Sequence, residues 1–234
     1  MTKEKFVDFL ARCSQFENVY FKKERVEMDG KEVDRLHLIA VEGTHTIAMV
    51  GNFTGEEVYQ LPDQEFKISP SKLLEFYRIS KNKPRFELEK NTLTMIGDNI
   101  RLDYRLDEIV EKDKEITIPY DEGIELKITP QKFEEILKLK NAINGRKISI
   151  SYNKNGCDFK IIGDNDLNSA VVHIDKNNPE EFTEEFLAIF FEPVKFVADK
   201  DTLFYLQKDY PATFKLIDSE YMVQYTVAGV KMGN

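Results

Sequence analysis

Apolar residues recur at helical spacing in two stretches that open with nearly the same residues. Lys67–Lys72 reads Lys-Ile-Ser-Pro-Ser-Lys, and Lys127–Lys132 reads Lys-Ile-Thr-Pro-Gln-Lys, 60 positions later. Both strings predict the start of a helix, because Ser or Thr caps the first turn and proline is favoured at the first helical position. The apolar positions of the two predicted helices are Leu73, Leu74, Tyr77, Phe133, Ile136 and Leu137. Both helices are expected to be amphipathic.

Alternating apolar and polar residues after each predicted helix indicate a pair of strands. The first pair is Arg85–Glu89 with Thr92–Met95, and the second is Lys147–Ser151 with Asp158–Ile161. Both hairpins end in the same four residues, Ile-Gly-Asp-Asn, at 96–99 and 162–165. Two matches in the same order predict a duplicated unit of helix and sheet.

The segment between the two copies is acidic and lacks a helical pattern. Residues 107–125 contain eight acidic and two basic residues around the string Ile-Thr-Ile-Pro-Tyr. Pro119 and Gly123 punctuate this extended pattern, which favours a strap on the surface; a solvated acidic loop is the alternative. We therefore predict an N-terminal domain (1–106), a connecting loop (107–123) and a C-terminal domain (124–234).

Positive charge is concentrated on the two copies of the repeat. Lys67–Arg85 contains six basic residues and one acidic residue, and Lys127–Lys147 contains six basic and two acidic residues. These stretches carry +5 and +4, so the rest of the chain carries -18 to give the net charge of -9. A charged helix face is usually only solvated, but the equivalent positions favour a phosphate-binding surface. The candidate phosphate-contacting residues are Lys5, Arg12, Lys72, Arg78, Lys81, Lys83, Lys132, Lys138, Lys140, Arg146 and Lys147.

No motif for reading bases or for catalysis accompanies these charges. The sequence has no zinc-finger spacing, no aromatic and basic RNP pattern and no basic heptads, so contacts to nucleic acid would go to phosphates. Nucleotide-binding glycine motifs and hydrolase motifs are missing as well. The histidines His37, His45 and His173 are scattered, and the adjacent acids Glu184 and Glu185 would not share a helix face. We therefore expect no catalytic site, no metal and no cofactor.

Composition indicates a globular protein of a reducing cytoplasm. Hydrophobic residues make up 41% of the 234 positions and include 17 Phe and 10 Tyr, enough for one large or two medium cores. Cys13 and Cys157 lie far apart and are expected to be buried thiols. The N-terminus is charged and no apolar run approaches the roughly 18 residues of a membrane span, so neither export nor membrane insertion is expected.

Three parts of the chain resemble the DNA sliding clamps of the proliferating cell nuclear antigen family, in the same order. Residues 39–50 are similar to a strand-turn-strand of these clamps, and the apolar-x-Ile-Pro string at 116–119 resembles their interdomain connecting loop. Asp209-Tyr210-Pro211 and the segment 225–230 resemble the family's Asp-x-Pro strand and its closing segment. The chain departs from the family at Gly229, where proline is usual, and at Thr226, which replaces a frequent aromatic residue.

The resemblance implies an α+β DNA clamp fold, with two topologically similar domains whose helices line the inside of a ring and whose sheets lie outside. A last core helix around Glu184–Glu192 would carry no Lys or Arg, which leaves one quarter of the expected DNA surface without positive charge. A homotrimer would close head to tail by pairing edge strands, here Ile100–Arg105 and Ala170–Ile174. The predicted subunit-interface residues are Leu102, Tyr104, Val172 and Ile174.

The function that the resemblance implies is that of a polymerase processivity factor that encircles double-stranded DNA without sequence specificity. DNA polymerase, the clamp loader and other replication and repair proteins would insert a short helical turn with aromatic anchors into an apolar pocket. The expected location is cytoplasmic or nucleoid-associated, or nuclear in a eukaryote. The predicted pocket residues are Val41, Met49, Ile116, Ile118, Pro119, Pro211, Ala228 and Gly229.

Two other functions are compatible with the sequence. A clamp-like accessory protein of checkpoint or viral type would work as a monomer or in a hetero-oligomer, and its mass in solution would distinguish it. An α+β enzyme with a diffuse acidic site would need a deep pocket with convergent carboxylates of shifted pKa.

Overall fold

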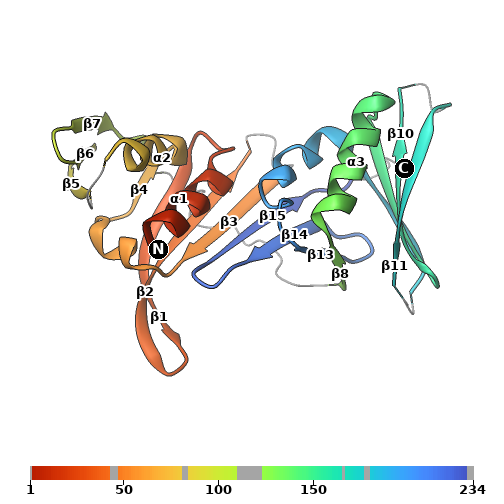
Figure 1. Ribbon diagram of the computed structural model, residues 1–234, viewed down its shortest axis with the longest axis horizontal. Helices are drawn as coiled ribbons and strands as arrows, with labels where there is room; N and C mark the ends of the chain where they lie inside the picture. The colour runs from red at the N-terminus through yellow and green to blue at the C-terminus, as the bar shows by residue number, and fades with distance from the viewer. Residues whose placement is uncertain are drawn as a thin grey trace. The chain divides into compact units, whose positions relative to one another are not determined.

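The computed structural model describes residues 2–42, 47–80, 84–109, 123–164, 167–176 and 180–230 of the chain. These residues form two compact units, whose helices and strands Figure 1 shows. Each unit has its own hydrophobic core. Of the described residues, the first unit contains 2–42, 48–109 and 217–223, and the second contains Ile47, 123–216 and 224–230. A short segment near the end of the chain thus completes the first unit.

The first unit contains two antiparallel sheets and two helices that lie side by side. Its elements are α1 (Thr2–Cys13), β1 (Val19–Met28), β2 (Lys31–Val41), β3 (Ile47–Phe53), the 3-10 helix η1 (Glu56–Gln60), β4 (Phe66–Ile68), α2 (Pro70–Ile79), β5 (Arg85–Glu89), β6 (Thr92–Ile96) and β7 (Arg101–Arg105). One sheet has the strand order β4-β1-β2-β3 and the other the order β5-β6-β7. Phe6 of α1 and Tyr77 of α2 are buried with ring centroids 4.9 Å apart, so both helices contribute to one aromatic core.

The second unit, like the first, contains antiparallel strands and helical segments. Its elements are β8 (Ile124–Ile128), α3 (Pro130–Ala142), β9 (Lys147–Asn153), β10 (Gly156–Ile162), β11 (Ser169–Asp175), β12 (Phe182–Leu187), the 3-10 helices η3 (Ala188–Phe191) and η4 (Pro193–Phe196), β13 (Thr202–Leu206), β14 (Ala212–Ile217) and β15 (Tyr221–Val227). The strand orders are β11-β10-β9-β12 and β15-β14-β13-β8. Phe214 lies at the centre of the core, with Phe204 at 4.9 Å and Phe191 at 5.4 Å between ring centroids.

The two predicted helix starts are confirmed, with one difference at the caps. Thr129 caps α3, since its hydroxyl accepts a hydrogen bond from the amide of Lys132 at 3.4 Å. Ser69 occupies the same position before α2, but its hydroxyl lies 2.7 Å from that of Ser71 and makes no cap bond. Both helices have proline at their first position, where its fixed backbone angle favours the start of a helix.

The predicted duplication extends to four modules, two in each unit. A complete module is a lead strand, a helical segment and three strands: β4-α2-β5-β6-β7, β8-α3-β9-β10-β11, and β12 with η3 and η4 before β13-β14-β15. The first module, α1-β1-β2-β3, has no lead strand within the described residues. Each lead strand pairs antiparallel with the first strand of the other module in its unit, β4 with β1, β8 with β13 and β12 with β9. The predicted α+β class is confirmed.

The predicted fourth helix over 184–192 is wrong. Residues 182–187 form strand β12, in which Phe186 is fully buried and Phe182 lies with its ring 5.3 Å from that of Tyr152 on β9. After β12, every third residue is fully buried, at Ala188, Phe191 and Val194. A buried position every three residues matches the 3-10 helix, whose side chains at i and i+3 align, and not the 3.6-residue period of an α-helix.

Candidate functional site

The exposed residues of α2 include two cations and the carboxylate of Glu75. Lys72 and Arg78 are exposed, and neither makes an ion pair within the described part of the chain. The Lys72 ammonium lies 5.2 Å from the centroid of the Tyr104 ring on β7. Lys81 and Lys83, the next predicted phosphate contacts, lie outside the described residues. The described cations of α2 are thus available to an anionic partner.

The cations of α3, in contrast, are matched by carboxylates of the same unit. Lys138 pairs with Glu134 at 2.7 Å, Lys132 pairs with Glu135 at 3.2 Å, and Lys140 pairs with Glu192. The Lys140 side chain is only 11% exposed. The predicted contacts that follow α3 are exposed but also have acidic partners, Asp164 for Arg146 and Glu185 for Lys147. A phosphate would have to compete with these carboxylates.

Helix α1 contributes the least available charge. Arg12 is 4% exposed; its Nε donates to the Tyr221 hydroxyl at 3.0 Å and its Nη2 lies 3.1 Å from an Asp8 oxygen. Lys5 forms an ion pair with Asp218. The burial of Arg12 contradicts the predicted phosphate contact, because a guanidinium held inside the unit cannot reach a ligand in solvent.

The second unit contains a hollow of about 640 Å³, lined by strand β12, by the turn between β13 and β14 and by the segment after β15. It brings together three of the predicted pocket residues, Pro211, Ala228 and Gly229. The sequence analysis missed its other lining residues, which are Thr183, Glu184, Glu185, Lys208, Asp209, Tyr210 and Val230. Sequence repeats gave no signal for them, because they come from strand β12, the turn before β14 and the segment after β15, which meet only in the fold.

Backbone hydrogen bonds hold the walls of this hollow in place. The Glu184 carboxylate accepts from the amide of Asp209 at 2.8 Å, and Asp209 has a left-handed backbone, with φ of 65°. The amide of Val230 donates to the Glu185 carbonyl at 2.7 Å. Three carboxylates and one ammonium, that of Lys208, line the hollow. Its chemistry suits an apolar anchor flanked by a positive charge.

The other predicted pocket residues are not brought to this hollow. Val41 is half-buried and Met49 is fully buried, both in the first unit. The burial of Met49 contradicts a pocket-lining role in the unit as it stands, because its side chain is already covered by the core. Ile116, Ile118 and Pro119 lie outside the described residues.

The predicted subunit-interface residues lie on edge strands, but one of them belongs to the core. Both β7 and β11 are at the edge of their sheets, as predicted. Leu102 and Tyr104 of β7 and Ile174 of β11 are half-buried, whereas Val172 is 1% exposed. The neighbouring Val171 is 54% exposed, because successive residues of a strand point to opposite faces. Val172 is therefore corrected to a core position, and Val171 is the apolar residue that β11 offers to solvent.

A histidine between two carboxylates lies on the exposed face of β11. The ring of His173 lies 2.5 Å from Asp158 through Nδ1 and 3.3 Å from Asp175 through Nε2. The hydrogen bond to Asp158 raises the pKa of His173 above its usual 6.5, and the charges of both carboxylates act in the same direction. Asp158 also accepts from the side-chain amide of Asn153 at 3.0 Å.

This cluster predicts a small pH dependence of stability. Since folding raises the pKa of His173, its contribution is fully present below about pH 6.5 and is lost as the pH rises through the folded-state pKa. We expect the difference in denaturation midpoint between the wild type and His173→Gln to shrink over that range. The effect stays small because the ring is exposed. Urea titrations at several pH values test this, and Asp158→Asn should remove the same dependence.

The described residues contain neither a metal site nor a reactive thiol. They contain no group of three or more His, Cys, Asp or Glu arranged to hold a metal ion. Cys13 and Cys157 are buried thiols, as predicted; burial raises the pKa of both, that of Cys157 to about 12. None of the described helices is long and apolar enough to cross a membrane.

Solved structures similar to this chain include sliding clamps. The A. fulgidus PCNA, solved with the C-terminal region of FEN-1, has a TM-score of 0.71 at 15% identity, covering 100% of this chain and 98% of that one. The Entamoeba histolytica proliferating cellular nuclear antigen gives 0.73 at 13% identity, covering 98% and 96%. Caulobacter crescentus pol III beta gives 0.76 at 12% identity over 99% of this chain, which spans 65% of that longer chain. No family model and no curated protein matches the sequence. The chain has the sliding-clamp fold.

Proposed function

We propose that this chain is a subunit of a DNA sliding clamp, a ring that encircles duplex DNA and acts as a processivity factor without chemistry of its own. The observation that carries the proposal is the four-module clamp fold together with Lys72 and Arg78 of α2, which are exposed and make no ion pair with the described residues. Phosphate contacts alone hold a protein on DNA at every base step with nearly the same energy. That property suits a protein that slides.

Client proteins would dock on the hollow of the second unit. The A. fulgidus clamp was solved with the C-terminal region of FEN-1 bound, so peptide binding occurs on this fold. Pro211, Ala228 and Gly229 would receive the apolar anchors, and the carboxylates around them would attract basic flanking residues. DNA polymerase and the clamp loader are the expected clients of a replication and repair clamp.

Assembly into a homotrimer would use the two edge strands. The exposed backbone edges of β7 and β11 suit head-to-tail pairing between subunits. The second candidate is a clamp-like protein of checkpoint or viral type, monomeric or hetero-oligomeric, and analytical ultracentrifugation separates the two. For the intact protein we propose domains at 1–106 and 124–234 joined by 107–123, and a cytoplasmic, nucleoid-associated or nuclear location.

The test of the DNA surface compares unpaired with paired cations. Lys72→Glu and Arg78→Glu should weaken duplex binding, and each should lower the slope of log affinity against log salt by about one, since each removes one phosphate contact. Lys138→Glu should have a smaller effect, because Lys138 is already paired with Glu134. Fluorescence anisotropy with labelled duplexes at several salt concentrations measures the affinity and the salt slope of each variant. An unchanged slope in the α2 variants, or more than about tenfold preference for one base sequence, would contradict the proposal.

A further inference from the structure

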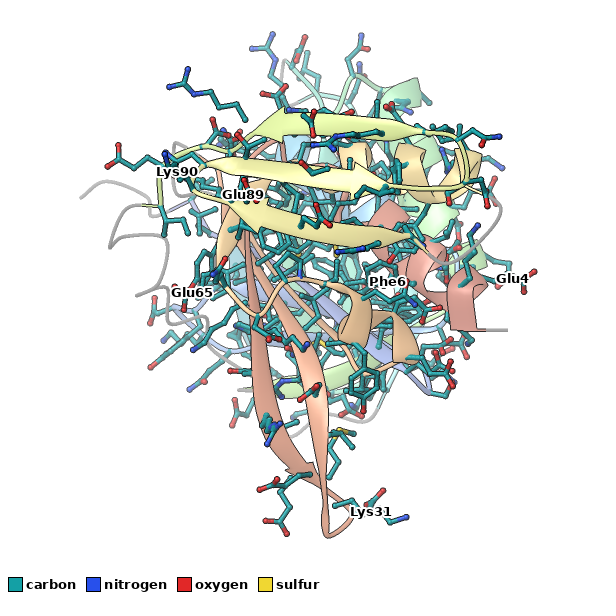
Figure 2. The ribbon with its side chains drawn as sticks, turned by 90° about the vertical axis from the view of Figure 1, so that its left-hand side faces the viewer. Glu4, Phe6, Lys31, Glu65, Glu89 and Lys90 are labelled. Atoms are coloured by element: carbon teal, nitrogen blue, oxygen red, sulfur yellow. The ribbon has the colours of Figure 1, made fainter. Side chains whose placement is uncertain are left out.

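The first hairpin of the first unit is longer than the corresponding hairpins of the other modules. β1 has ten residues and β2 eleven, whereas the corresponding strands of the other modules have five to seven. Beyond Phe21 on β1 and ahead of Leu36 on β2, the two strands pair only with each other among the described residues. Figure 2 shows this end of the hairpin reaching away from the helices, with Lys31 labelled at its tip. The arm, residues 24–35, is thus an extension that the other modules lack.

A tight turn and a cross-strand ion pair make the arm a preformed element. Asp29 and Gly30 join its strands with φ of 51° and 72°. Positive φ at both central residues is what a type I′ turn requires, and Asp-Gly is a favoured sequence for it. Nearer the body of the unit, Arg35 donates to Glu24 at 2.9 Å through Nε. A partner of the arm therefore does not have to order it, which lowers the entropic cost of binding.

One face of the arm carries apolar side chains that the unit leaves partly exposed. Val26 and Val33 lie directly opposite each other, and Met28 follows on the same face because the side chains of a strand alternate. Both valines are half-buried and Met28 is 46% exposed. Nearer the body of the unit, the opposed residues Tyr20 and Ile39 on this face are only 3% and 8% exposed. The apolar residues of the arm are therefore the part of this face that a partner can still cover.

The other face of the arm has like charges opposite each other at its outer end. Arg25 lies opposite Asp34, and its Nε is 3.5 Å from a carboxylate oxygen of that residue. Further out on this face, Glu27 lies directly opposite Glu32. Both glutamates are exposed, and neither has an ion pair within the described part of the chain. Like charges directly opposite destabilise an antiparallel pair, so the hairpin carries an unfavourable contact that a cation from a partner would relieve.

The charge at the outer end of the arm determines which partners fit it. Residues 26–33 contain three acids, Glu27, Asp29 and Glu32, and one base, Lys31, so that -3 and +1 give a net charge of -2. This charge repels the phosphates of nucleic acids and of anionic lipids, and it attracts Lys and Arg side chains. An apolar face backed by an acidic face thus fits a polypeptide that presents both apolar and cationic side chains.

We propose that the arm is a docking site for an extended segment of a partner protein with a cation-apolar-cation sequence. A strand added at an edge presents side chains to both faces at once, because successive residues point to opposite faces. β2 is the edge that fits, because two acids, Glu32 and Asp34, flank Val33 on it, whereas the residues that flank Val26 on β1 differ in charge. The apolar side chain of the segment covers Val33, and its cations meet the two carboxylates. The site uses neither the cations of α2 nor the hollow of the second unit, so it stands or fails independently of the proposed function.

A labelled peptide Thr-Lys-Val-Lys-Thr, blocked at both ends, is the probe for the arm. We expect saturable binding of this peptide to the 234-residue protein, measured by fluorescence anisotropy. Thr-Lys-Lys-Val-Thr has the same composition without the alternation and should bind at least about tenfold more weakly, because its cations cannot both reach the acidic face. Equal affinity of the two peptides would reduce the interaction to net charge and overturn the proposal, as would a lack of saturable binding by the first.

Glu32→Lys tests the arm itself. It turns the like-charge pair with Glu27 into a pair of opposite charge, so it should raise the melting temperature while it weakens binding of the Lys-Val-Lys peptide at least about tenfold. Glu17→Lys makes the same change of net charge at an exposed position outside the arm and should bind within about threefold of the wild type. Circular dichroism establishes that each variant is folded.

Two results with these variants overturn the proposal. One is an unchanged peptide affinity in Glu32→Lys, and the other is an equal loss of affinity in Glu17→Lys. Self-association of the wild type that Glu32→Lys removes would assign the arm to a second copy of the chain and overturn the proposed partner.

Discussion

Replacement of Val172 by aspartate is expected to unfold the second unit, whereas the same change at Val171 should leave it folded. Val172 is 1% exposed and faces Phe159, itself fully buried, on β10. An unpaired carboxylate there costs several kcal/mol, comparable with the roughly 5 to 15 kcal/mol that stabilise a whole domain. Val171 points to solvent, so a charge there needs no burial. Circular dichroism melting of the two variants measures the difference.

The same pair of variants reports on assembly. If β11 meets β7 of the next subunit, Val171→Asp should give a folded protein with a lower mass in sedimentation than the wild type. His173→Gln, on the same exposed face of β11 but without added charge, is the matched control and should assemble normally. A Val172→Asp variant that melts like the wild type would show that the side chain is not in the core. An unchanged mass for Val171→Asp would remove β11 from the interface.

If clients dock on the hollow of the second unit as proposed, filling it is expected to abolish most of their binding. Gly229 lines it and has ordinary backbone angles, so a side chain can be added there without strain. The indole of Gly229→Trp would occupy space that an aromatic anchor needs. Loss of such an anchor typically costs about 2 kcal/mol, so affinity for a peptide from the FEN-1 C-terminal region should fall about thirtyfold. Isothermal titration calorimetry measures it.

Gly229→Ala is the control for that experiment. A Cβ at this position would lie 3.6 Å from the Glu185 carbonyl and 3.7 Å from the Phe186 ring, which are normal contacts. The alanine variant should therefore bind like the wild type. If a folded Gly229→Trp variant keeps full affinity, clients dock elsewhere on the chain.

Local signals in the sequence were enough to predict the starts of α2 and α3 and the hairpins β5–β6 and β9–β10. Proline after a Ser or Thr placed the starts of α2 and α3 at the correct residue, because these preferences act within one turn. The hairpins were placed within a residue or two for the same reason. The segment 184–192 was misassigned because the resemblance to the clamps implied a helix there, and no local pattern of this sequence was weighed against it. Pairing of β12 with β9 and the three-residue spacing of buried positions decide the structure there.

The candidate site was harder to predict, because it depends on partners distant in sequence. Net charge along α3 suggested free cations, yet Lys140 meets Glu192, 52 positions away. The Arg12 guanidinium likewise donates a hydrogen bond to the hydroxyl of Tyr221, 209 positions away. Side chains of β11 alternate between its two faces, and both faces carry a valine. The sequence does not say which face is buried; the structure shows that Val172 lies in the core and Val171 does not. Sequence patterns locate a charge or an apolar residue but do not show what neutralises or covers it.

The closing of the first unit by Ile217–Val223 has a consequence for synthesis of the chain on the ribosome. Asp8 accepts from the Tyr221 hydroxyl, Lys5 pairs with Asp218, and the amide of Thr54 donates to the Glu220 carbonyl at 2.9 Å. Between residue 109 and residue 223 lie 114 further residues, or roughly 6 to 23 s of elongation at about 5 to 20 residues per second. Throughout that interval the nascent first unit lacks its last segment, and the contacts that Lys5, Asp8 and Thr54 make with that segment are not yet formed. The complete first unit can therefore form only after nearly all of the second unit has been synthesised.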